Sequence, residues 1–206
     1  MTAYSGFVLI PHETYLAWKN AVAGNGYDAD GSFGWQCWDL AAEFWYNVGF
    51  PTSPLYPQTG PNLSAYECWT VSREVNASYN GTTYFDLIYN LADVKQGDVV
   101  VFNQSAFSTA GHIGFADEDY SGSGYLKVLG QNQGTTGTPP PVIHPNGLAY
   151  GTTATVTNLS LSLIPFLGAF RYRGWSTPPT PTEQKKPAQK RFPWVLYARK
   201  FRNGRR

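Results

Sequence analysis

The segment from Cys37 to Phe50 carries one continuous apolar stripe, and it constrains the fold more than any other feature of the sequence. The stripe is formed by Leu40, Ala41, Phe44, Trp45 and Val48. This spacing is that of an α-helix with one face buried against a core. Gly49 and then Pro51 supply a stop signal. The sequence therefore predicts a core helix that begins at Cys37.

In the second half of the chain the helical period gives way to short apolar runs. Short runs rich in Val, Ile, Leu, Phe and Tyr are separated by Gly- and Ser-rich turns, which is typical of β-strands. These runs are 97–103, 112–116, 125–131 and 167–173. A helix followed by strands predicts an α+β fold in which the Cys37 helix packs on an antiparallel sheet.

Weaker patterns fill the rest of the chain. Residues 14–23 predict a short helix, and the Gly- and Asp-rich residues 24–34 predict a loop without regular structure. Residues 52–90 are rich in Pro, Asn, Ser and Tyr and predict a decorated connection, with a weak helical pattern over 84–91. The proline-rich stretch 136–147 predicts a loop between strands.

Charge divides the chain into a body and a tail. Nine of the fifteen Lys and Arg residues lie after position 175, where Glu183 is the one acid. The first 175 positions then hold six basic and thirteen acidic residues, so the body is acidic and the tail strongly basic. We expect a folded domain over 1–175, a Pro-rich linker over 176–190 and a basic aromatic tail over 191–206.

Several protein classes are excluded by composition. Two cysteines, Cys37 and Cys68, are too few for a disulfide scaffold or a structural zinc site. The N-terminus lacks a basic region, and its apolar run is interrupted by Pro11, so we expect no signal peptide. A membrane span needs about 18 consecutive apolar residues, and no apolar run in the sequence approaches that length, so we expect no transmembrane segment.

Cys37 lies where the glycine-rich loop meets the first turn of the predicted helix. Unpaired backbone N–H groups and the positive end of the helix dipole should lower the pKa of its thiol. A cysteine nucleophile also needs a base and a polar group that orients the base. His112, at the start of a predicted strand after Gly111, is the candidate base.

The third member of such a site should lie at the end of the next strand, where Gln131, Asn132 and Gln133 follow one another. We choose Asn132, because a neutral amide can accept from an imidazole N–H and hold its tautomer. Taken singly, Cys37 can be an inert buried thiol and His112 a plain strand end. Cys68 has no glycine loop before it, and we interpret it as structural.

A second pattern overlaps the first. Asp28, Asp30, Ser32, Gly34 and Asp39 reproduce the 1, 3, 5, 7, 12 ligand spacing of a calcium loop. The loop lacks the usual glycine at its sixth position and ends in Asp instead of Glu. The alternative is a turn that only caps the helix. A bound Ca²⁺ would order the nucleophile and would be structural.

Three segments, YDADGSFGWQCWDL, GDVVVFNQSAFSTAGHIGFA and VLGQNQG, resemble the CHAP family of peptidoglycan hydrolases. The resemblance covers roughly residues 24–133. It implies a papain-like α+β fold with Cys37 as nucleophile, His112 as base and Asn132 as the orienting residue. Several phage members carry a calcium loop just before their cysteine. Some members have Glu where this chain has Gly130.

This resemblance implies a hydrolase that degrades bacterial cell wall. The expected reaction is cleavage of an amide bond in the peptidoglycan stem peptide or cross-bridge, by a cysteine endopeptidase or an N-acetylmuramoyl-L-alanine amidase. The protein would act at the wall after release from the host cytoplasm at lysis, or while carried on a phage virion. The tail would then bind phage tail proteins or an anionic wall polymer, or serve as a solubilising extension. We expect no specific nucleic-acid binding.

Two alternatives stay open from the sequence. The chain is a virion-associated tail component that uses the same chemistry to penetrate the wall, or it is a catalytically inactive wall-binding or structural module. The intact set of Cys37, His112 and Asn132 argues against the inactive module.

Overall fold

The computed structural model describes residues 3–32, 34–50, 56–106, 108–133, 142–143, 149–150 and 152–175. The chain separates into two compact units, Met1–Ser176 and Thr177–Arg206, and all of these residues belong to the first. The predicted linker (176–190) and tail (191–206) lie outside the described residues. Within the described part, no helix is both long and apolar enough to cross a bilayer.

A six-stranded antiparallel sheet, in the order β11-β8-β7-β6-β12-β5, organises the first unit. Its strands are β5 (Phe85–Ile88), β6 (Val99–Phe102), β7 (His112–Ala116), β8 (Tyr125–Gly130), β11 (Thr155–Ser160) and β12 (Phe166–Tyr172). Three of the four runs predicted as strands contain one of these elements, and the fourth, 167–173, overlaps β12, which begins one residue earlier. The predicted α+β class, with an antiparallel sheet, is confirmed.

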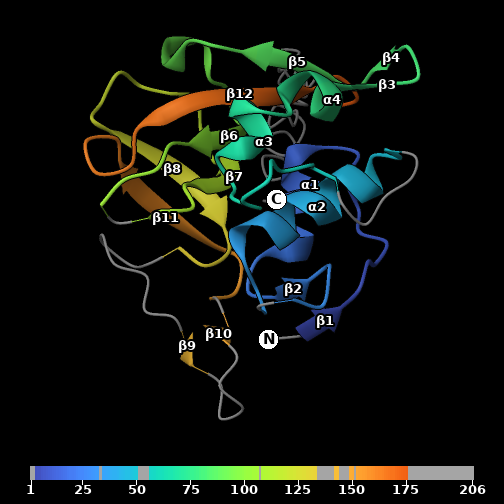
Figure 1. Ribbon diagram of the computed structural model, residues 1–206. Coiled ribbons are helices and arrows are strands. Elements are labelled where there is room, and N and C mark those ends of the chain that lie inside the picture. The colour runs from blue at the N-terminus through green and yellow to red at the C-terminus, as the bar shows by residue number, and fades with distance from the viewer. Residues whose placement is uncertain are drawn as a thin grey trace, which may run out of the picture. The chain divides into compact units, whose positions relative to one another are not determined.

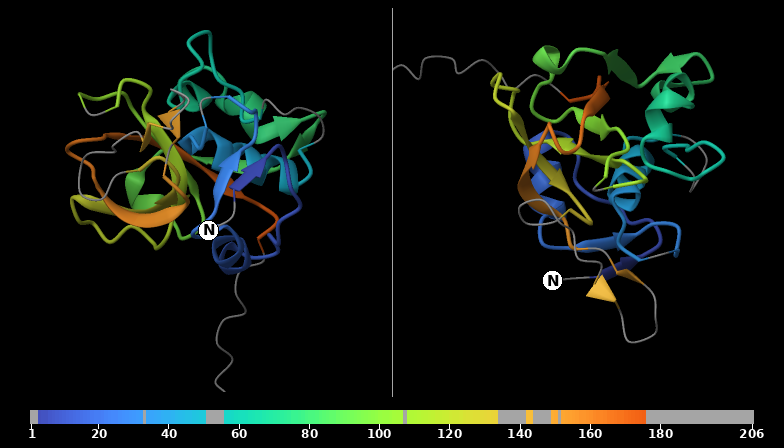
Figure 2. Two further views of the ribbon diagram at one scale, coloured as in Figure 1. Left: turned by 90° about the horizontal axis from the view of Figure 1, so that it is seen from below. Right: turned by 60° about the vertical axis from the view of Figure 1, so that its left-hand side comes forward.

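Two helices, α1 (Tyr15–Val22) and α2 (Cys37–Asn47), lie together on one face of this sheet, as Figures 1 and 2 show. The predicted helix over 14–23 is confirmed, with Thr14 as a cap that accepts the Ala17 N–H at 3.1 Å. In α2 the predicted stripe is buried, and Phe44 is fully buried between Trp18 and Phe115, with ring centroids at 5.0 and 5.2 Å. This aromatic core fixes α2 against β7.

The sheet has a core on each face. Along β6 the side chains alternate, with Val99 and Val101 in the main core beneath α2, and Val100 and Phe102 in a smaller core on the opposite face. All four are fully buried. Burial on both faces explains why this strand is a continuous apolar run and not an alternating one.

Shorter elements surround the sheet. These are β1 (Ala3–Ser5) paired in parallel with β2 (Gly26–Asp28), β3 (Ser78–Tyr79) with β4 (Thr82–Thr83), β9 (Val142–Ile143) with β10 (Ala149–Tyr150), the helices α3 (Glu67–Thr70) and α4 (Arg73–Ala77), and the 3₁₀ turn η1 (Leu91–Asp93). The region 52–90 is therefore more structured than a connection. Part of the proline-rich stretch 136–147 lies outside the described residues.

Two local predictions are wrong. Residues 24–34 contain the strand β2, because β1 supplies a partner that the loop sequence does not reveal. The weak helical pattern over 84–91 is the strand β5, because its pairing with β12 and the burial of Phe85 outweigh local propensity.

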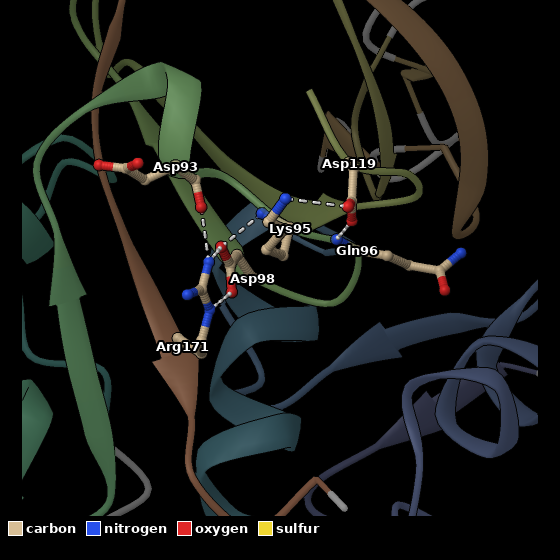
Figure 3. Close-up of polar contacts among 6 residues, drawn as sticks. All are labelled: Asp93, Lys95, Gln96, Asp98, Asp119 and Arg171. Carbon is tan, nitrogen blue, oxygen red and sulfur yellow. Dashed lines mark hydrogen bonds and ion pairs between the residues drawn. The ribbon is translucent and has the colours of Figure 1, made fainter. Parts of the chain in front are cut away.

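A polar network, drawn in Figure 3, ties β12 to the turn before β6. Arg171 donates from Nε and Nη2 to the two carboxylate oxygens of Asp98 at 2.8 and 2.7 Å, and from Nη2 to the Asp93 carbonyl at 2.7 Å. Asp98 also accepts the Lys95 N–H at 2.8 Å. Burial raises the pKa of Asp98 and outweighs the opposing effect of Arg171. The Arg171 guanidinium thus offsets part of the cost of burying the Asp98 carboxylate.

Candidate active site

Cys37 is the first residue of α2, at the junction of the glycine-rich loop and the buried helix. The preceding residue, Gln36, has extended backbone angles (φ −88°, ψ 163°), and its N–H donates to Asp39 Oδ2 at 2.8 Å. A carboxylate at the third helical position that reaches back to the residue before the helix fixes where the helix begins. Cys37, which is partly buried as a residue, is therefore held at a defined point.

Burial controls the protonation of this thiol. It raises the pKa of Cys37 to about 11, although the backbone N–H groups of Ile113, Trp38 and Cys37 itself act in the opposite direction. The expectation of a lowered pKa is wrong, because the donors at the helix start only partly offset the loss of water. Through the Ile113 N–H, the thiol meets β7 one residue after His112.

His112 begins β7 and is buried. Its backbone pairs with Phe102 of β6, and the two rings lie with centroids 6.0 Å apart. Burial lowers the pKa of His112 to about 4, with the contact to Gln133 acting in the opposite direction. At neutral pH the imidazole is therefore uncharged and has one nitrogen free to accept a proton.

Gly111 is needed before His112 for two reasons. Its φ is +68°, in the left-handed region that side chains disfavour. A Cβ on Gly111 would also lie 2.5 Å from the Phe102 carbonyl oxygen and 2.8 Å from the Cβ of Tyr66. The glycine lets the chain turn tightly against β6 as it enters β7.

Three consecutive amide side chains after β8 connect the parts of the site. Gln131 donates to the Gln36 carbonyl at 2.9 Å, and Asn132 donates to the Gln36 side chain (Oε1) at 2.6 Å. Gln133 Oε1 lies 3.1 Å from His112 Nε2. The residue next to the candidate nucleophile and the ring of the candidate base are thus both held by one tripeptide.

The amide that contacts the imidazole is Gln133, whereas Asn132 contacts Gln36 beside Cys37. Asn132 has a φ of +49°, so the chain turns there and the strand alternation of side chains ends. Once the alternation of side chains is broken, the sequence cannot show which of the three adjacent amides faces the imidazole of His112. The orienting role of Asn132 stays a prediction.

The predicted calcium ligands Asp28, Asp30 and Asp39 come together. One carboxylate oxygen from each lies within 4.8 Å of the others. Burial, and then Asp30, raise the pKa of Asp28, and burial is the largest cause that raises the pKa of Asp39 to about 8. The Oδ1 atom of Asp28 is buried and has no hydrogen-bond partner among the described residues. A cation would satisfy this oxygen and offset the repulsion, so these residues fit one.

The other two predicted ligands lie in the same loop. The Ser32 N–H donates to Asp30 Oδ1 at 2.7 Å, which bends the loop around the carboxylate. Gly34 has a φ of +72°, and its carbonyl accepts the Gln36 N–H at 2.9 Å. The ligand roles of Ser32 and Gly34 stay predictions.

Sequence comparison finds relatives among phage lytic enzymes. The chain is 36% identical over 122 residues to the D-alanyl-L-alanine endopeptidase of Streptococcus phage B30, an alignment that covers 59% of this chain and 25% of that protein. It is 31% identical over 123 residues to Endolysin PlyTW of Staphylococcus phage Twort, which covers 58% and 23%. The chain is similar in sequence to phage endolysins. It spans about a quarter of the length of these relatives.

The fold gives a related result. The crystal structure of the wild-type endolysin LysIME-EF1 matches with a TM-score of 0.52 at 21% identity, over 82% of this chain and 67% of that one. At this identity the match concerns the fold. No protein-family model matches the chain, so membership of the CHAP family stays a prediction.

Proposed function

We propose that this chain is a CHAP-type, papain-like peptidoglycan hydrolase that cleaves an amide bond of the stem peptide or cross-bridge. Cys37 would be the nucleophile and His112 the acid/base. The observation that carries the proposal is the position of Cys37 at the first turn of a buried helix, joined through residues 131–133 to the imidazole of His112. The similarity to two phage lytic enzymes supports the same reading.

The proposed mechanism starts from an uncharged pair, because burial raises the pKa of Cys37 and lowers that of His112. His112 takes the thiol proton as sulfur forms its bond to the amide carbonyl carbon, and it passes that proton to the departing amine when the C–N bond breaks. Water, deprotonated by His112, then hydrolyses the thioester and releases Cys37. The backbone N–H groups at the start of α2, including that of Cys37, would stabilise the oxyanion.

We further propose that Asp28, Asp30 and Asp39 hold a structural Ca²⁺, with Ser32 and Gly34 completing the set. The cation would supply positive charge that links the end of β2 to the start of α2. The chain's own contribution is the position of Asp39, which accepts the Ala29 N–H at 2.9 Å through Oδ1 and the Gln36 N–H through Oδ2. Ordering this carboxylate orders the residue next to the nucleophile.

The bond cut and the place of action are also proposals. Because one relative is named a D-alanyl-L-alanine endopeptidase, a D-alanyl-L-alanine peptide bond is the first substrate to test. The bond between muramic acid and L-alanine, the amidase substrate, is the alternative. The protein would reach the wall either at host lysis or on a virion, with peptidoglycan as its partner.

Digestion of purified peptidoglycan tests the reaction class. Walls with different cross-bridges are incubated with the protein, and the products are identified by mass spectrometry together with titration of new amino groups. New alanine or cross-bridge amino termini on products whose lactyl groups still carry the stem peptide indicate an endopeptidase, whereas glycan strands with free lactyl groups indicate an amidase. Walls that bind the protein but release no product would overturn the hydrolase in favour of a wall-binding module. Co-purification with phage particles would identify the virion-associated form.

A further inference from the structure

Both donors of the Gln133 side chain are committed to backbone carbonyls. Nε2 donates to the Val128 carbonyl of β8 at 2.8 Å and to the Thr155 carbonyl of β11 at 2.5 Å. The residue is buried. If the amide were turned over, its oxygen would face two carbonyl oxygens and its N–H groups would face the imidazole. The sheet therefore determines that Oε1 points at His112.

This orientation has a consequence for the ring. Oε1 is only an acceptor, so the His112 Nε2 atom at 3.1 Å must carry a hydrogen and donate it. A neutral imidazole holds one N–H, which leaves the Nδ1 lone pair as the site that can accept a proton. The amide thus selects one of the two tautomers.

We propose that Gln133 is the positioning residue of the site: it holds His112 in the Nε2–H tautomer, so that Nδ1 is the nitrogen that exchanges the proton with Cys37. The proposal deepens the proposed function and rests on it for the role of Cys37. It gives to Gln133 the role that the sequence predicted for Asn132, whose amide donates to Gln36 instead.

Gly130 makes room for this arrangement. A Cβ at Gly130 would lie 2.7 Å from Gln133 Oε1 and 3.3 Å from His112 Nε2. Any side chain at this position would therefore push against the hydrogen bond itself. The glycine at 130 therefore leaves the space that the Gln133 amide needs to reach His112. The orienting group comes from three residues further along the chain.

The tautomer is measured directly by ¹⁵N NMR of protein labelled at histidine, in which protonated and lone-pair nitrogens have well-separated shifts. We expect His112 to show a protonated Nε2 and a bare Nδ1 in the wild type, and to keep them in Asn132→Ala. In Gln133→Leu, which removes the acceptor, we expect a mixture of tautomers. A wild-type His112 protonated on Nδ1, or a folded Gln133→Leu variant with an unchanged tautomer, would overturn the proposal. If the variant fails to fold, the wild-type spectrum alone still decides the tautomer.

Kinetics and a double substitution test the role in the reaction. Loss of the Gln133 acceptor should lower kcat about 10- to 100-fold with little change in KM, because orientation is needed in the chemical step. Gly130→Ala should lower kcat in the wild type but have little further effect in Gln133→Ala, since the atom it collides with is then gone. Equal effects in both backgrounds would contradict the proposal. If the wild type cleaves no wall, the proposed function fails, but the NMR result still decides the tautomer.

Discussion

Gln131 and Tyr27 exchange two hydrogen bonds through a single side-chain amide. Gln131 Oε1 accepts the Tyr27 N–H at 2.7 Å, and its Nε2 donates to the Tyr27 carbonyl at 3.0 Å. The same Nε2 donates to the Gln36 carbonyl. A fully buried side chain thus does for β2 what a neighbouring strand would do, and it joins the aspartate loop to the helix that begins with Cys37.

We predict that Gln131→Leu destabilises the protein by about 3 kcal/mol, because it removes the three hydrogen bonds that this buried side chain makes to the backbone of Tyr27 and Gln36. Urea unfolding followed by tryptophan fluorescence measures the change. Gln104→Leu is the matched control, since Gln104 is exposed and its side chain makes one bond to the Thr109 carbonyl. That control should cost less than about 0.5 kcal/mol. Equal losses in the two variants would contradict the structural role of Gln131.

Calcium should raise the stability of the protein through the three aspartates. At a concentration about 100-fold above its Kd, a ligand specific to the folded state adds about 2.7 kcal/mol. We expect Tm to rise with Ca²⁺ and to fall on chelation. Asp30→Asn should abolish the response without harming the fold, because Asp30 is exposed. Glu118→Gln, which removes an exposed carboxylate elsewhere, should keep it. A rise in Tm of equal size in Asp30→Asn would refute this site.

Stability should fall as pH rises, partly because of Glu43. This side chain is fully buried in α2, and burial raises its pKa to about 8. The folded state then holds a proton that the unfolded state has lost, so stability decreases between the ordinary Glu pKa of about 4.3 and about 8. Glu43→Gln should remove up to about 3 kcal/mol of this loss between about pH 5 and 8.

Urea unfolding at the two pH values measures the Glu43 effect. The exposed Glu74, changed to Gln, is the control and should leave the pH dependence as in the wild type. If Glu43→Gln loses as much stability as the wild type between the two pH values, Glu43 is ionised throughout and the account of its burial is wrong.

The parts of the fold that sequence predicts are those with a strong local period. The stripe from Leu40 to Val48 predicts α2 because a buried face repeats every turn, and the run at Val99 predicts β6 because both of its faces are covered. The strand that begins at Phe85 shows where prediction from a local pattern fails. This strand depends on β12, more than eighty residues further on, and local propensity contains no record of that partner.

In the candidate site, too, some features follow from the sequence and others depend on the three-dimensional fold. Residue type and chain order are enough to propose Cys37, His112 and the three amides that follow β8 as candidates. Three-dimensional burial is not available from sequence, so the pKa of Cys37 was expected in the wrong direction. The contact of Gln133 with His112 depends on the turn at Asn132, which a strand pattern cannot foresee.

The central claim is that Cys37 is the nucleophile, and the most direct test compares two cysteine substitutions on purified cell walls. Cys37→Ala should lose wall lysis while it keeps the wild-type Tm. Cys68→Ala removes the other thiol, which is fully buried and whose pKa burial also raises, and it should keep its activity once any loss of stability is allowed for by measurement below its Tm. Lysis by Cys37→Ala at the wild-type rate would contradict the account.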